Sequence, residues 1–234
     1  MNIVDIIIIV FILLFGITGA KRGLFKESVL CIGTILVFYL AYQFKDPIGN
    51  FFLLRFPMFD FPNLFKGVIT LNILVYQLLA FVIVLSLLLI IFNIIVSVTG
   101  LLEKLLKITI ILGIPSKILG FILGLIEGYV IAFVVLFFLT QPAFSFDLFM
   151  NSKFSNKILT SSPVLTNITQ NTVDIVSNIY ELKDEKNVNV LNNKTLDMML
   201  DKKIVSYQTA KQLYDDKKMN FEGIEEILQK YKNE

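Results

Sequence analysis

Histidine is absent from the 234-residue chain, and Cys31 is its single cysteine. These absences exclude a Ser-His-Asp or Cys-His catalytic centre, a thiolate zinc site and a disulfide within the chain. The net charge is only +2, and the sequence has no basic run or aromatic-basic motif of an RNA-binding domain. We therefore predict a protein that is not an enzyme, holds no metal or other cofactor and does not bind nucleic acid.

Long apolar stretches dominate the first 142 positions, and hydrophobic residues make up 56% of the chain. A bilayer core of about 30 Å takes roughly 20 apolar residues of helix. The sequence predicts an all-α polytopic membrane protein with interfacial amphipathic segments, comprising a membrane domain (1–142) and a soluble, polar helical tail (143–234). The four predicted transmembrane helices are 3–20, 28–44, 72–98 and 118–139.

The last of these helices carries an acidic side chain and a glycine stripe. Gly120, Gly124 and Gly128 lie four residues apart, so a neighbouring helix can approach that face to backbone contact. Glu127 lies on the same side and should face protein or a wet cavity, because lipid exposure costs at least a few kcal/mol. Two interpretations remain for Glu127: a protonated structural group or a transport or proton-relay group. We predict that this helix is the packing centre of a bundle.

Charged residues flank the first predicted span asymmetrically. Asp5 lies at its start, whereas Lys21 and Arg22 follow it, the reverse of a secretory signal peptide. By the positive-inside rule the link after this span is cytoplasmic. With four spans, both termini are then expected on the periplasmic side.

The link 21–27 is too short to cross a membrane, so the first two spans should form an antiparallel hairpin. Gly23 can adopt the positive φ that a tight link demands. Arg22 can pair with Glu27 or with a lipid phosphate.

Two further segments are expected to lie along the membrane rather than cross it. Residues 45–66 are rich in phenylalanine, and their prolines, Pro47 first, should prevent a single long helix. Residues 99–116 form a basic amphipathic segment.

The third apolar stretch, 67–98, exceeds the bilayer core and predicts a tilted helix that begins in the headgroup region. Its polar residues recur at intervals of four, seven or multiples of seven and share one face, which should look inward and hydrogen-bond to other helices. A water-lined path is the alternative. These residues are Asn72, Ser86, Asn93 and Ser97.

After residue 142 the composition becomes polar, and the tail reads as amphipathic helices. Ser162 followed by Pro163 has the form of a helix start. A linker is expected at 183–193, followed by helices at about 195–217 and 221–232. Helices this short need a surface to cover, so they pack on each other or on the membrane, or they recruit a partner protein. The apolar stripe of the first tail helix comprises Leu165, Ile168, Thr172, Ile175, Ile179 and Leu182.

Several short motifs occur together in the membrane part. They are Asn2-Ile3-Val4-Asp5, Lys21-Arg22-Gly23-Leu24 with Glu27, and Lys117-Ile118-Leu119-Gly120 with Gly124 and Glu127-Gly128. In order and spacing, residues 2–139 resemble the bacterial colicin V production protein family, whose members often carry Arg-Gly where this chain has Glu127-Gly128. The resemblance implies an inner-membrane protein linked to colicin V production or export and to envelope physiology. Some relatives continue into a periplasmic serine protease, which this histidine-free tail cannot be.

Three functions follow as hypotheses. The first is an accessory or scaffold protein in toxin production, secretion or envelope maintenance, whose tail binds another membrane or envelope protein. The alternative is a small oligomeric channel or transporter that uses Glu127 and the polar face of the third span. An intramembrane acid–base enzyme would need Asp5 and Glu127 to meet. The candidate packing or functional residues are Asp5, Arg22, Gly23, Glu27, Asn93, Gly120, Gly124, Glu127 and Gly128.

Overall fold

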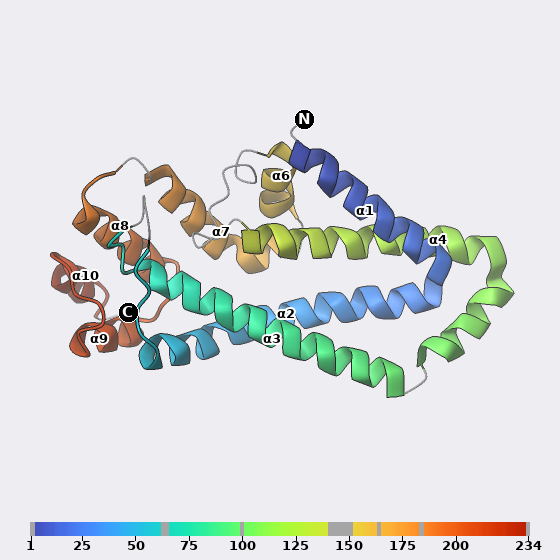
Figure 1. Ribbon diagram of the computed structural model, residues 1–234, viewed down its shortest axis with the longest axis horizontal. Helices are drawn as coiled ribbons and strands as arrows, with labels where there is room; N and C mark the ends of the chain where they lie inside the picture. The colour runs from blue at the N-terminus through green and yellow to red at the C-terminus, as the bar shows by residue number, and fades with distance from the viewer. Residues whose placement is uncertain are drawn as a thin grey trace. The chain divides into compact units, whose positions relative to one another are not determined.

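The computed structural model describes residues 3–61, 66–98, 101–139, 152–162, 165–182 and 185–232, with the side chains of 101–112, 167, 168 and 180 left aside. Helices make up most of these ranges, which contain no strand, and this confirms the all-α prediction (Figure 1). The long helices are α1 (Ile3–Arg22), α2 (Leu24–Arg55), α3 (Leu71–Val98) and α4 (Leu101–Leu139). The shorter ones are α6 (Lys153–Ser161), α7 (Leu165–Glu181), α8 (Val188–Asp201), α9 (Tyr207–Asp215) and α10 (Ile224–Lys230).

Within the described ranges, four helical segments are long and apolar enough to cross a membrane: α1, α2, α3 and the Gly113–Leu139 part of α4. This confirms the prediction of a multi-pass membrane protein. Large apolar side chains cover the outside of these helices, as lipid contact requires; Ile3, Ile7 and Ile32 are each more than 60% exposed.

The chain forms two compact units. The first contains α1, α2 to residue 43, α3 from residue 82, α4, α6 and the start of α7 to residue 168. The second contains the rest of α2 and α3 together with the tail helices from residue 169 onward. This division does not follow the compositional boundary at residue 142, because the tail helices share a core with the ends of α2 and α3.

In the first unit, α1, α2, α3 and α4 are connected through direct helix contacts. The α1 and α4 backbones lie side by side (Figure 1). Phe38 of α2 meets Phe133 of α4 edge to face, with ring centroids 6.0 Å apart. The Phe92 ring of α3 lies on Gly33 of α2. Each contact is made at a glycine, where the helices can approach closely, or by a large aromatic ring that fills the space between them.

Two predicted boundaries of α2 were wrong. The link 21–27 shrinks to Gly23, whose φ of +76° reverses the chain between α1 and α2. At the other end Pro47 lies inside α2, which continues to Arg55. A proline removes one backbone hydrogen bond, a loss that neighbouring groups can offset in a helix of this kind.

The backbone of α4 is helical from Leu101, but Gly113 has non-helical angles of φ 54° and ψ −129°. This glycine separates a leading segment from the spanning segment. Pro115 follows within the first turn of the spanning segment, where its missing N–H has no cost. Thr99 and Gly100, the start of the segment predicted to lie on the membrane, fall outside the described residues.

The prediction that the polar face of α3 looks inward was wrong for most of that face. Asn72 is buried, but Ser86, Asn93 and Ser97 are exposed. The contact between Phe92 and Gly33 sets the rotation of this part of α3, and no periodicity within α3 could reveal that contact.

From residue 169 onward the tail folds into the second unit. The stripe of α7 is buried at Thr172, Ile175 and Ile179, where it contributes to a core with Leu71 and Leu74 of α3. Pro163 and the Ile168 side chain lie outside the described set.

Other tail boundaries differ from the prediction. The expected linker is shorter, because α8 begins at Val188 with Asn187 as its N-cap. The helix expected at 195–217 is divided into α8 and α9, and Ser206 caps the second of these. A further helix, α6, was not expected from the sequence; its N-cap is Ser152.

Candidate functional site: a buried ion-pair cluster in the membrane bundle

The glycines of α4 bring its backbone against α1. A Cβ placed on Gly120 would lie 2.4 Å from the Gly19 carbonyl oxygen, and one on Gly124 would lie 2.4 Å from that of Phe15. A Cβ on Gly128 would lie 2.6 Å from the Phe15 Cβ. Real Cβ atoms do not approach so closely, so any side chain here would push the helices apart.

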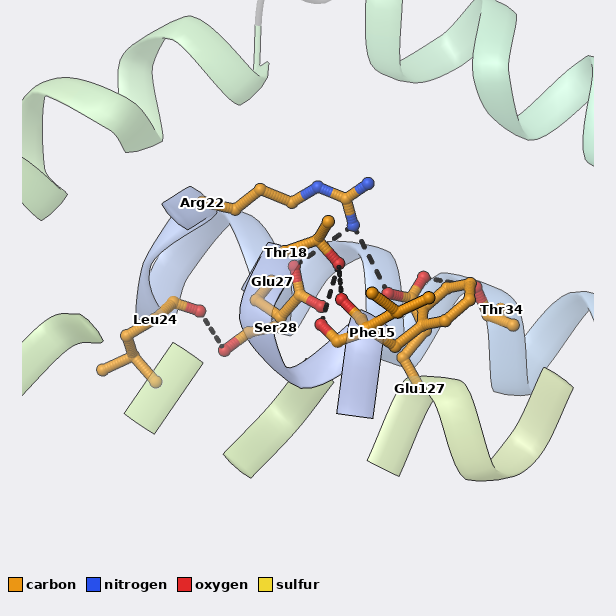
Figure 2. Close-up of polar contacts among 9 residues, drawn as sticks. Phe15, Thr18, Arg22, Leu24, Glu27, Ser28, Thr34 and Glu127 are labelled. Atoms are coloured by element: carbon orange, nitrogen blue, oxygen red, sulfur yellow. Dashed lines mark hydrogen bonds and ion pairs between the residues drawn. The ribbon is translucent and has the colours of Figure 1, made fainter. Parts of the chain in front are cut away.

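Beside this interface, Arg22 joins three helices (Figure 2). Its Nη1 donates to Glu27 Oε2 of α2 at 3.3 Å and to Glu127 Oε2 of α4 at 3.5 Å. Thr34 of α2 donates to Glu127 Oε1 at 3.3 Å. We call Arg22, Glu27, Thr34 and Glu127 the Arg22 cluster.

Local helix structure explains why these charges are tolerated where they lie. Arg22 is in the last turn of α1 and Glu27 in the first turn of α2, positions where the helix dipoles favour a cation and an anion. Gly23, between them, turns the chain so that both side chains reach the same space. The hairpin itself therefore pre-forms half of the cluster.

Burial gives the cluster its energetic weight. Glu27 is fully buried and Glu127 is 6% exposed, whereas the Arg22 side chain is 35% exposed. Within the described ranges, Glu27 Oε1 has no hydrogen-bonding partner. One guanidinium thus faces two buried carboxyl groups, and losing it would leave them uncompensated.

A hydroxyl from α4 completes the start of α2. The Leu24 backbone N–H donates to Ser116 Oγ at 3.0 Å, and Ser28 Oγ donates to the Leu24 carbonyl oxygen at 2.8 Å. The first N–H groups of a helix have no partner inside it, so Ser116 acts as a cap supplied by another helix.

Asp5 lies at the opposite end of α1 from the Arg22 cluster. Its Oδ1 accepts hydrogen bonds from the Ser152 hydroxyl and, at 3.1 Å, from the Phe154 backbone N–H. A carboxylate at the N-terminus of α6 is favourable for the helix dipole. Asp5 therefore anchors α6 to the start of α1. About 25 Å of α1 separates Asp5 from Arg22, so the structure does not bring Asp5 and Glu127 together as an acid pair.

The model of the family described as colicin V production protein matches residues 4–168. The chain belongs to this family. No curated protein and no solved structure matches it. The matched region ends at residue 168, which is also the last residue of the first unit. The colicin V production family region therefore contains the whole Arg22 cluster and omits most of the tail.

For this colicin V production family member, the structure groups some sequence candidates and separates others. Arg22, Glu27 and Glu127 meet in one cluster, beside the glycine interface. Asn93 is exposed on α3 and Asp5 lies with α6. Among the described side chains, no group of three or more His, Cys, Asp or Glu residues is placed to hold a metal ion.

Sequence reasoning missed the hydroxyl partners of the cluster. Thr34 follows Glu27 by seven residues, so the two share a face of α2, and this spacing was a usable signal. Ser116 and Ser152 had no such signal, because each meets its partner only through tertiary packing.

Proposed function

We propose that this chain is a non-catalytic accessory or scaffold protein of the bacterial inner membrane, acting in colicin V production or secretion or in envelope maintenance. In this proposal both termini are periplasmic and the tail binds another membrane or envelope protein. Family membership and the form of the polar site support the proposal.

The main observation in favour of a scaffold is that the buried charges of the bundle pair with one another. Glu27 and Glu127 are both engaged by Arg22, and Thr34 adds a donor to Glu127. Each bond joins helices to one another, as expected for a brace that holds a bundle in one arrangement.

The tail offers a surface for a partner. A hollow of about 460 Å³ in the second unit is lined by two lysines and two tyrosines, together with Ser206 at the start of α9. Lys203 and Lys232 are exposed, whereas Tyr231 is buried and its hydroxyl donates to Asp197. The two lysines therefore carry the attraction to a partner. The hollow suits an acidic, extended segment of an envelope protein. The lysines and tyrosines are Lys203, Tyr207, Tyr231 and Lys232.

The test is crosslinking in living cells, followed by isolation of the tagged full chain and identification of bound proteins. The combined substitutions Lys203→Glu and Lys232→Glu should remove a partner that the parent retains. Lys157→Glu, an exposed charge reversal on α6 in the other unit, is the matched control. Retention of every partner by the double variant would contradict the role given to the tail.

A second candidate is a small oligomeric channel or transporter. It is favoured by the placement of two carboxyl groups and a partly exposed guanidinium inside a lipid-facing bundle. Because Asn93 is exposed on α3 whereas Glu127 is buried, one copy does not combine both into one path. Flux of protons, ions or small solutes into liposomes that Glu127→Gln abolishes would favour this function over the scaffold.

A further inference from the structure

One face of α3 has the spacing of a helix–helix seam. Its members follow one another at intervals of three, four, three and four, the pattern by which two helices pack with a left-handed crossing. All of them are exposed. They are Ile83, Ser86, Ile90, Asn93 and Ser97, and we call this set the α3 seam.

Packing inside the chain fixes the direction of this seam. The Phe92 ring lies so close to α2 that a Cβ on Gly33 would be 2.1 Å from the Phe92 Cζ. The next residue, Asn93, is turned by about 100° around the helix, and it is exposed. The bundle therefore holds Phe92 inside and presents Asn93 outside.

An exposed asparagine is costly at this position. Asn93 lies about 7.5 Å of helix rise before the end of α3 at Val98, inside a segment apolar enough to span the membrane. Its amide has donors and acceptors that lipid tails cannot satisfy. Amide hydrogen bonds between membrane helices contribute roughly 0.6 to 2 kcal/mol each.

We propose that the α3 seam binds the same seam of a second copy of this chain, forming a parallel homodimer in the membrane. Copies inserted with the same topology place their α3 helices parallel, and a two-fold axis brings the two Asn93 amides together. An amide is both donor and acceptor, so each Asn93 satisfies the other. Ser86 and Ser97 are small and allow close approach on either side. This inference does not depend on the proposed function.

Cysteine crosslinking tests the face. In the full chain carrying Cys31→Ala, reconstituted at a high lipid-to-protein ratio, Ile90→Cys should form a disulfide-linked dimer on mild oxidation. Ile91→Cys should not, because it lies off the seam. The two positions are adjacent, have the same native residue and are 56% and 51% exposed. Equal crosslinking at both positions, or none at Ile90→Cys, would overturn the proposal.

A second substitution tests the amide itself. Adding Asn93→Leu to the Ile90→Cys chain should lower the association constant of the dimer by on the order of tenfold. Asn93→Gln should retain most of the association. Leucine is favoured in a membrane span, so the folded bundle should persist, which circular dichroism checks. Undiminished dimer with Asn93→Leu would show that the Asn93 amide does not hold the copies together.

Discussion

Arg22 is the residue on which the polar part of the bundle depends most. It contacts carboxyl groups from α2 and α4 while part of its own side chain remains exposed. Water can therefore solvate part of the guanidinium, whereas Glu27 and Glu127 have little access to water and depend on Arg22. Removing Arg22 would therefore leave two buried carboxyl groups without a cation, and this cost adds to the loss of the two ion pairs themselves.

Arg22→Gln should lower the free energy of unfolding by about 1–3 kcal/mol, below the usual cost of breaking a fully buried pair because Arg22 is partly exposed. Thermal unfolding of the purified protein in detergent measures the loss. Lys21→Gln removes an exposed neighbouring charge and should change stability little. Combining Arg22→Gln with Glu27→Gln should recover part of the loss; equal effects of the Lys21 and Arg22 variants would refute the brace.

Gly124→Ala should separate α1 from α4, because the new Cβ would meet the Phe15 carbonyl oxygen, a backbone atom that cannot move alone. We expect a loss of about 1–3 kcal/mol, as for other overpacked sites, measured by the same unfolding experiment. Gly33→Ala is the comparison, since its Cβ would meet the Phe92 ring, which can rotate. A smaller loss at Gly124 than at Gly33 would contradict the backbone-contact interpretation.

Among the helices, α2 has both of its ends stabilised by residues that are distant in sequence. Ser116 caps its start and the hairpin glycine precedes it. At its other end, Lys218 Nζ donates to the carbonyl oxygens of Leu54 at 2.7 Å and Phe56 at 3.0 Å. A cation at a helix C-terminus satisfies carbonyls that lack partners within the helix.

Lys218→Met should therefore destabilise the second unit by about 1–2 kcal/mol, through loss of charge-assisted hydrogen bonds and of a favourable dipole contact. Hydrogen exchange should show faster exchange in α9 and at the end of α2, while α1 is unaffected. Lys217→Met, at the exposed preceding position, should leave these rates unchanged. If the exchange rates at the end of α2 were the same in both variants as in the parent, Lys218 would not stabilise the end of α2.

At the scale of the whole molecule, the tail is part of a folded unit rather than a free arm. Gln77 of α3 donates to the Ile204 carbonyl oxygen at 2.6 Å, and Thr70 donates to Asn192 through its backbone N–H at 3.2 Å and its hydroxyl at 3.1 Å. These buried bonds fix the tail helices to the start of α3. The apolar stripe of α7 is thus covered within the unit, and the proposed partner would have only the outer surface of the tail to bind.

Four candidate spans predict that both ends of the chain lie on one side of the membrane, and the positive charge after α1 predicts that this side is the periplasm. A C-terminal alkaline phosphatase fusion should be active and a C-terminal green fluorescent protein fusion dark. Fusions placed after residue 22 should show the reverse pattern. A fluorescent C-terminal fusion would contradict the periplasmic placement and would put the proposed binding surface of the tail in the cytoplasm.

The sequence alone determined the class of this protein, because apolar run length, glycine spacing and the absence of histidine report local chemistry directly. Hydropathy was sufficient to predict four spans, and the spacing of Gly120, Gly124 and Gly128 placed them on one face. Only the tertiary structure decided that Arg22 bridges Glu27 and Glu127, that Pro47 is inside a helix, that Asn93 faces outward and that the tail shares a core with α3. Each of these depends on contacts between residues distant in sequence, and helical periodicity gives the face a residue occupies but not what that face meets.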